Sequence, residues 1–228
     1  MLLLFLLTAS MFCYYLLVKD KLLHHQYQVS DIEIKQPEVV YEGFFAMQKL
    51  SYRYPKFAGG SSSWLHHEVM VRPPAVVVLP IDIKERKVVL IEQIRSGIVA
   101  VSGRQPWLYE VVAGLLEAKD SPVSGAEREL EEETGLQALA WEKIAQYWVS
   151  PGGSTEEVYA YCALVDSSEA GGIHGLATEN EDIRVQAFAM DDVLDALQRG
   201  EINNSATLLC LQWLQLNQAK LVSMWSSI

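Results

Sequence analysis

The stretch that decides the fold runs from Gly114 to Leu136 and reads Gly-Leu-Leu-Glu-Ala-Lys-Asp-Ser-Pro-Val-Ser-Gly-Ala-Glu-Arg-Glu-Leu-Glu-Glu-Glu-Thr-Gly-Leu. Ser121 is a good N-cap residue, and Pro122 suits the first position of a helix, where a missing N–H costs nothing. Gly135 suits the left-handed residue just past a helix end. The stretch therefore predicts a short acidic helix that begins at Pro122 and stops at Gly135.

Three carboxylates share one face of this helix, because Glu129, Glu132 and Glu133 stand at i, i+3 and i+4. Like charges at this spacing repel by about 0.2–0.5 kcal/mol per pair. A bound cation removes that cost, and hard divalent ions such as Mg²⁺ prefer carboxylate oxygens. Taken without its surroundings, a run of glutamates is more typical of a solvated acidic face.

The spacing of all the residues from Gly114 to Leu136 is a more specific family signature than the three glutamates alone. Gly114 is followed by five residues, Asp120, seven residues, Arg128-Glu129-Leu130, one residue, Glu132-Glu133, one residue and Gly135-Leu136. This pattern resembles the Nudix box at every fixed position but one, since Asp120 stands where the family has Glu. The exchange keeps the charge and shortens the reach, so it affects a peripheral contact rather than a metal site. The resemblance implies an α/β Nudix fold, in which helices sandwich a mixed β-sheet.

A second group of motifs narrows the resemblance. Pro151 lies fifteen positions after Leu136, as in the ADP-ribose pyrophosphatases among Nudix enzymes. The likeness extends from about Val29 to Leu221, and the chain is identified as a member of the bacterial ADP-ribose diphosphatase subfamily. The stretches that carry it are Val89–Arg95, Pro106–Gly114, Ser150–Ser154, Gly172–Arg184, Gly200–Asn204 and Leu211–Leu216.

The resemblance implies a role for particular residues. The metal ligands would be the carboxylates of Glu129, Glu132 and Glu133 and the backbone carbonyl of Ala113, which together hold two or three Mg²⁺ ions, with Mn²⁺ as a substitute. Glu179 would be the base that activates water, with Glu181 in support, although the two could exchange roles. The implied substrate contacts are Phe44 to the adenine, Arg95 to phosphate, Glu110 and Ser150.

The residues alone leave these roles open. Arg95 ends a strand, where a surface salt bridge is as ordinary as a phosphate clamp, and Glu179–Asp182 reads as a polar surface loop. The implied reaction is Mg²⁺-dependent hydrolysis of ADP-ribose to AMP and ribose 5-phosphate. The alternatives are another nucleoside diphosphate sugar as substrate, or a catalytically inactive Nudix module that binds ADP-ribose.

Composition excludes some partners. The chain has 228 residues, of which 50% are hydrophobic, and carries 18 basic against 29 acidic residues for a net charge of -11. It has no cluster of Lys and Arg, so nucleic acid is not an expected partner. Cys13, Cys162 and Cys210 are widely spaced, which indicates buried or incidental thiols in a reducing compartment rather than disulfides or a zinc site.

The chain divides into three parts by pattern. Residues 1–27 begin with an apolar run, Met1 to Val18, that is marginal for a spanning helix of roughly 20 residues. This run is either an inner-membrane anchor or a spurious extension, and Lys19 and Lys21 favour a cytoplasmic location for the domain C-terminal to them. Residues 28–72 predict a small N-terminal antiparallel β-sheet, and residues 73–221 form the hydrolase domain.

The N-terminal segment alternates polar and apolar residues in three stretches, Asp31–Lys35, Phe45–Tyr54 and Ser63–Val71. A sheet this thin is hardly stable alone, so it packs on the main domain or on a second subunit. The resemblance implies a homodimer that exchanges this sheet. His66 and His67 are adjacent in a strand, so they point to opposite faces and are not expected to form a metal pair.

The main domain contains strongly β-branched stretches and two amphipathic ones. We expect one continuous strand over Trp107–Ala113, leading directly into the box. The other expected elements are strands at Pro74–Pro80, Lys87–Arg95, Ala145–Val149 and Glu157–Val165, and helices at Asp191–Arg199 and Ser205–Gln218.

Overall fold

The structure is a computed structural model that describes residues 23–226 and 228, and of Glu179 the backbone alone. The apolar run at residues 1–18 and Cys13 lie outside the described residues. Within the part of the chain that is described, none of the helices has the length and apolar character needed to cross a bilayer. The described chain forms two compact units, residues 23–38 with 49–68, and residues 39–48 with 69–228 apart from residue 227.

The N-terminal β-strands form a four-stranded sheet in which β3 (Ala46–Arg53) pairs with the others. These are β1 (Glu33–Ile34), β2 (Glu38–Glu42) and β4 (Leu65–Val71). Within the smaller unit, His66 hydrogen-bonds Ser51 and His67 packs against Tyr52. Separate partners engage the two histidines, which agrees with the expectation that they do not form a pair.

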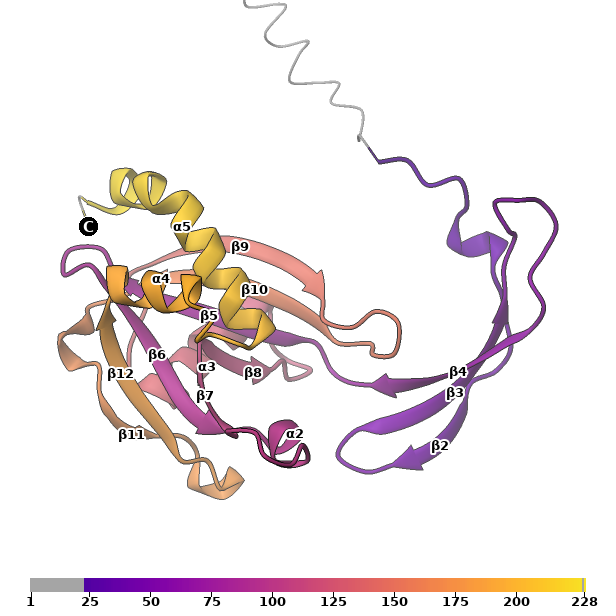
Figure 1. Ribbon diagram of the computed structural model, residues 1–228, viewed down its shortest axis with the longest axis horizontal. Helices are drawn as coiled ribbons and strands as arrows, with labels where there is room; N and C mark the ends of the chain where they lie inside the picture. The colour runs from indigo at the N-terminus through magenta and orange to yellow at the C-terminus, as the bar shows by residue number, and fades with distance from the viewer. Residues whose placement is uncertain (1–22, 227) are drawn as a thin grey trace, which may run out of the picture. The chain divides into compact units, whose positions relative to one another are not determined.

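The larger unit contains an eight-stranded mixed sheet with the order β11-β12-β6-β5-β10-β9, in which β7 also pairs with β6 and β8 with β5 (Figure 1). All these pairs are antiparallel except β5 with β10. The strands are β5 (Ala75–Asp82), β6 (Lys87–Ile94), β7 (Trp107–Glu110), β8 (Val112–Leu115), β9 (Ala140–Trp148), β10 (Glu157–Leu164), β11 (Gly172–His174) and β12 (Ile183–Ala189).

The sheet opens where β5 and β6 diverge. These strands pair only beside their turn, at Ile81 with Val88 and Asp82 with Lys87. Farther along, β6 pairs with β7 and β5 pairs with β8. The expectation of one strand over Trp107–Ala113 is therefore wrong: the run breaks at Val111 because its two halves pair with different strands, and the N–H of Val111 donates to Thr207 Oγ1.

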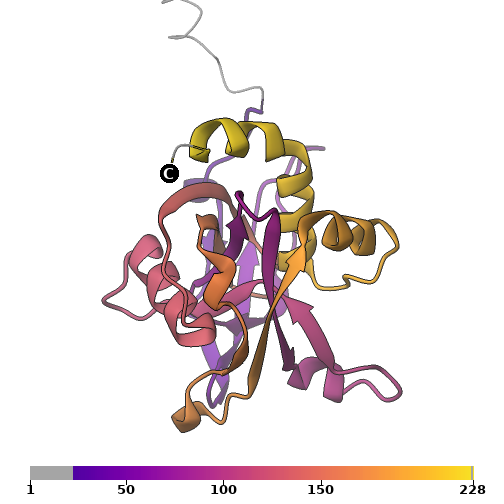
Figure 2. The same ribbon diagram turned by 90° about the vertical axis from the view of Figure 1, so that its left-hand side faces the viewer.

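Helices cover both faces of this sheet, as Figure 2 shows. One apolar layer joins the sheet to α4 (Met190–Gln198) and α5 (Ser205–Trp225), and includes Val77, Leu79 and Leu211. The other layer joins it to α3 (Pro122–Thr134), through Val89, Ile91, Ala126, Leu130 and Ile183. The short helix α2 (Ser96–Val99) and the 3-10 helices η1 (Val29–Asp31), η2 (Ser167–Glu169) and η3 (Ala177–Glu179) lie in connections. The α/β class, with a mixed sheet between helices, is confirmed.

Local signals set both ends of α3. The Ser121 hydroxyl accepts a hydrogen bond from the Ser124 N–H, and Pro122 occupies the first helical position. Gly135 follows the helix with φ 70°, in the left-handed region, and its N–H donates to the carbonyl of Glu131. The predicted helix and both of its capping residues are confirmed.

Two thiols are buried where α5 packs on the sheet. Cys162 on β10 and Cys210 on α5 belong to the same apolar layer, and both are free. Burial raises the pKa of Cys162 well above its ordinary value and that of Cys210 to about 12. The expectation of buried thiols without a disulfide is confirmed for these two residues.

Candidate functional site

Gly114 is the place where the carboxylate of Glu129 rests. A Cβ atom at residue 114 would lie only 1.8 Å from Cδ of Glu129, so no other residue fits without moving that glutamate. Gly114 belongs to β8 and Glu129 to α3, which pack against each other in Figures 1 and 2. The glycine that opens the box therefore fixes the position of a carboxylate fifteen residues later.

Glu133 is the most deeply buried carboxylate of the box, with 2% of its surface exposed. Its Oε2 accepts a hydrogen bond of 3.0 Å from the backbone N–H of Ala113. Burial raises the pKa of Glu133 to about 8; the hydrogen bond from Ala113 and the charge of Arg95 oppose this rise, and the charges of Glu129 and Glu181 add to it. One hydrogen bond does not offset the loss of water around this group.

Arg128 holds the outer carboxylates of the helix. Its Nη1 lies 2.8 Å from Glu129 Oε1 and 2.8 Å from Glu132 Oε2, and its Nη2 lies 3.1 Å from Asp120 Oδ2. Asp120 also accepts from the N–H of Glu117. The residue that departs from the Nudix pattern thus makes an ion pair with the box arginine despite its shorter side chain.

Glu181 adds a carboxylate from a distant part of the chain. Burial raises the pKa of Glu129 to about 7, against the pull of Arg128, and Glu132 and Glu181 raise it further. The side chain of Glu181 accepts from the N–H of Leu176, and the N–H of Gly175 donates to the carbonyl of Glu132. The first bond lies within the loop before β12, and the second attaches this loop to α3. Glu179 belongs to this loop, at the end of η3.

Arg95 and Glu110 form an ion pair at the open end of the sheet, with 2.5 Å between Nε and Oε2. Burial of Glu110 raises its pKa although Arg95 opposes the rise. Both residues line a cleft of about 530 Å³ together with Ala113, Gly114 and Phe45. The cleft therefore adjoins the two residues against which Glu133 and Glu129 rest.

Phe44 and Ser150 do not join this group of carboxylates within the chain. Phe44 lies between β2 and β3 with 86% of its surface exposed. The next residue, Phe45, lines the cleft, and Cζ of Arg72 lies 4.4 Å from the centroid of its ring. Ser150 is exposed, and its carbonyl accepts from the N–H groups of Gly153 and Ser154. Phe45 and Arg72 were not predicted as site residues, because alternation along a strand does not show which of two adjacent phenylalanines faces inward.

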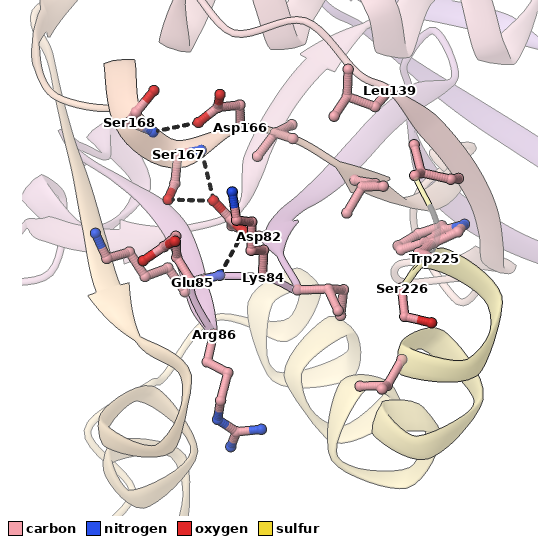
Figure 3. A pocket seen from close by; sticks show the side chains of 16 residues that line it. Asp82, Lys84, Glu85, Arg86, Leu139, Asp166, Ser167, Ser168, Trp225 and Ser226 are labelled. Atoms are coloured by element: carbon pink, nitrogen blue, oxygen red, sulfur yellow. Dashed lines mark hydrogen bonds between the residues drawn. The ribbon is translucent and has the colours of Figure 1, made fainter.

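A second hollow, of about 810 Å³, lies at the β5–β6 turn and the end of α5 (Figure 3). Its buried carboxylate, Asp82, accepts from the N–H of Glu85 and from both the N–H and the hydroxyl of Ser167. Backbone and hydroxyl donors lower the pKa of Asp82 although burial opposes them. This carboxylate is fully engaged by the protein, so the carboxylates around α3 remain the candidate site.

Within the described residues, no three His, Cys, Asp or Glu side chains form a closed metal-binding cluster. Arg128 holds Glu129 and Glu132, and the Ala113 N–H holds Glu133. The structure brings together the predicted residues Glu129, Glu132, Glu133, Glu181, Ala113, Arg95 and Glu110 around α3 and the open end of the sheet. Crowded, desolvated carboxylates beside an arginine and a cleft can bind cations and polarise water.

Known proteins resemble this chain over most of its length. It is 40% identical to the ADP-ribose pyrophosphatase of Haemophilus influenzae over 197 residues, which are 86% of this chain and 91% of that protein. The ADP-ribose pyrophosphatase of Escherichia coli (strain K12) is 39% identical, over 86% of this chain and 94% of its own. A GDP-mannose pyrophosphatase of Cronobacter sakazakii is 30% identical over 82% of this chain and 96% of its own.

A solved structure shares the fold. The crystal structure of an ADP compounds hydrolase matches with a TM-score of 0.61 and 20% identity, over 83% of this chain and 97% of that one. The family profile of the NUDIX domain matches residues 71–210, which include the whole box. These matches confirm the resemblance that the sequence pattern indicated. The chain belongs to the NUDIX family.

Proposed function

We propose that the protein hydrolyses the diphosphate bond of ADP-ribose, giving AMP and ribose 5-phosphate, in a reaction that depends on Mg²⁺. The observation that carries the proposal is the pair of buried carboxylates Glu129 and Glu133 beside a cleft lined by Arg95. Burial raises the pKa of both, and the charge of Glu181 raises each of them further. The names of the relatives at 39–40% identity support the choice of substrate.

The chemistry of the donor set fits Mg²⁺. Carboxylate and carbonyl oxygens are the ligands that this ion prefers, and a cation would compensate the charge of Glu133, whose pKa burial raises to about 8. We assign the binding of the ion to Glu129, Glu132 and Glu133 and to the carbonyl of Ala113. The N–H of Ala113 faces Glu133, and the N–H and C=O of one strand residue leave the strand on the same side. Mn²⁺ would suit the same ligands.

When bound, the metal supplies charge neutralisation of the diphosphate and acidifies a water molecule. The protein's part is to position and deprotonate. Arg95 binds a phosphate oxygen and is itself oriented by Glu110. Glu179, on the loop attached to α3, takes the proton from the attacking water, and Glu181 supports it. The two glutamates could exchange these roles.

A second candidate is another nucleoside diphosphate sugar. The GDP-mannose pyrophosphatase of Cronobacter sakazakii favours it, although at 30% identity rather than 40%. The box carboxylates would act in the same way, and only the contacts to the base and sugar would differ.

The deciding experiment measures Mg²⁺-dependent nucleotide release from ADP-ribose, ADP-glucose, NADH and GDP-mannose. The protein would begin at His24, with the full chain assayed in parallel. We expect preferred turnover of ADP-ribose, measured as kcat/KM. Preferred turnover of GDP-mannose would select the second candidate. Binding of ADP-ribose without turnover of any substrate would instead indicate an inactive module.

We also propose that the enzyme is a cytoplasmic homodimer that exchanges the sheet of residues 28–72, with any attachment to the inner membrane made by residues 1–18. In such a dimer Phe44 would stack on adenine in the partner's site, and Ser150 would contact the substrate. The exposure of Phe44 and of the apolar residues Val39, Val40 and Tyr41 on β2 supports a surface that another chain covers.

Removal of residues 1–72 should abolish both dimerisation and ADP-ribose affinity, because it removes the exchanged sheet. Light scattering coupled to size exclusion and steady-state kinetics would measure the two effects. A sharper variant is Phe44→Ala, for which we expect a higher KM at unchanged kcat. The matched control is Phe57→Ala, equally exposed at 83% but in the other unit, which should leave KM unchanged. A truncated monomer with a normal KM would contradict the dimer proposal.

A further inference from the structure

Gln93 on β6 carries a buried donor that the protein does not use. Only 8% of the residue is exposed, and its side-chain Nε2 is buried without a hydrogen-bond partner among the described residues. A buried amide that lacks a partner loses its bonds to water without compensation. A ligand that supplies the missing acceptor is one explanation for such a group in a folded protein.

The strand pattern places this amide on the face that carries the site. Side chains alternate along a strand, so Gln93 shares a face with Ile91 and Arg95. Ile91 packs in the apolar layer beneath α3. Gln93 is paired directly with Leu108, which lines the cleft next to Arg95 and Glu110.

The other neighbouring strand gives the same placement. In the register of β12 with β6, Arg184 is paired with Glu92, so Ile183 lies beside Gln93. Ile183 is buried in the layer under α3 and follows Glu181 by two residues. Gln93 therefore lies between the strand end that carries Arg95 and the loop that carries Glu181.

We propose that Gln93 is a substrate-binding residue whose amide N–H donates to an oxygen of the diphosphate. This inference rests on the proposed function, because it assigns an unassigned residue to the same site. A diphosphate oxygen is an anionic acceptor, and the adjacent Arg95 favours anions there.

The test replaces Gln93 by methionine, which has similar length and volume and no donor. Gln93→Met should lower kcat/KM for ADP-ribose about ten- to a hundredfold, the range for one hydrogen bond to a charged group. It should also raise the melting temperature of the metal-free protein, because the unpaired buried amide is gone. A residue that only supports the fold would give lower stability and lower activity together.

The matched control is Gln186→Met on β12. Gln186 is paired with Leu90, which faces the α4 and α5 layer, and it accepts from the Tyr109 hydroxyl. It carries the same amide on the same sheet but on the opposite face, so kcat/KM should stay at the wild-type value. A loss of activity in this control equal to that of Gln93→Met would overturn the proposal.

Calorimetric binding of a non-hydrolysable methylene analogue of ADP-ribose separates this inference from the proposed function. Suppose the wild type binds the analogue without hydrolysing ADP-ribose, and Gln93→Met binds it ten- to a hundredfold more weakly. The binding role of Gln93 would then stand, and the proposed hydrolytic function would be overturned. If the wild type hydrolyses ADP-ribose and Gln93→Met matches it in kcat/KM and binding, only the role of Gln93 is overturned. A wild type that neither binds nor hydrolyses overturns both.

Discussion

Asp82 and Glu133 are buried carboxylates of the same unit, and their pKa values are shifted in opposite directions. Asp82 is 5% exposed and Glu133 is 2% exposed, so burial alone does not distinguish them. Asp82 accepts from two backbone N–H groups and a hydroxyl, whereas Glu133 accepts from one backbone N–H. The pKa of Asp82 is lowered although burial opposes this, and burial raises that of Glu133 to about 8.

The difference shows how a carboxylate can serve structure or chemistry. The donors around Asp82 replace its water shell, so its charge is stabilised and it ties η2 to the β5–β6 turn (Figure 3). The charge of Glu133 lacks such replacement and faces Glu129 and Glu181. A carboxylate whose charge the fold leaves uncompensated is suited to bind a cation.

The largest expected effect comes from Glu133→Gln. Loss of this charge should lower kcat by about a hundredfold or more, because a preorganised charge contributes on that scale to the transition state. The fold should persist, since the amide oxygen can still accept from the Ala113 N–H. Mg²⁺-dependent AMP release and circular dichroism measure the two quantities. A folded variant with wild-type kcat would remove Glu133 from the metal site.

The converse change, Asp82→Asn, should affect stability rather than activity. An amide retains one acceptor oxygen, so a buried donor of Ser167 or Glu85 loses its partner, at a cost of about 1–3 kcal/mol. Urea unfolding measures the free energy of unfolding, and kcat should stay within about twofold, because the site at α3 is untouched. A large loss of kcat at unchanged stability would break the contrast between the two carboxylates.

The smallest effect is the pH dependence of stability in EDTA. The pKa of Glu133 in the folded protein is raised above its ordinary value of 4.5, so its burial destabilises the fold increasingly as pH rises from about 5 to about 8. The melting temperature of Glu133→Gln should therefore exceed that of the wild type at pH 8 by a few degrees, at about 2–4 °C per kcal/mol. The gap should close at pH 5. A gap that does not depend on pH would refute the raised pKa.

The pH dependence of stability that comes from Asp82 has the opposite sign to that from Glu133. Its pKa is lowered in the fold, so its contribution to stability is present above about pH 4 and is lost as pH falls through the lowered value. In the same EDTA series, the deficit of Asp82→Asn relative to the wild type should thus be undiminished between pH 5 and pH 8. Shrinkage of that deficit over this range would show that the carboxylate is not held ionised.

Sequence predicted those features that depend on neighbours along the chain. The limits of α3 followed from Ser121, Pro122 and Gly135, because a cap is a local hydrogen bond or a local φ value. The shared face of the box glutamates followed from the helical repeat. The sequence pattern also identified the family that the chain belongs to.

Features that depend on distant pairing could not be predicted in this way. The break at Val111 arises because β7 and β8 choose different partners, and the strand Glu38–Glu42 is exposed throughout, so it shows no alternation of burial. The burial of the unpaired Gln93 amide could not be predicted either, because it depends on the pairing of β6 with β7 and β12, which places Leu108 and Ile183 beside Gln93. The roles of Phe44, Ser150 and Glu179 stay predictions.

The two buried thiols where α5 packs on the sheet allow local opening of the protein to be measured. Cys162 and Cys210 are buried, and their raised pKa values keep the reactive thiolate scarce. A thiol reagent can therefore label them only when α5 lifts from β10 or the unit unfolds, so the labelling rate counts these openings. With Cys13 replaced by serine, the same measurement with and without substrate would show whether occupancy of the site slows the motion of α5, whose first residues line the cleft.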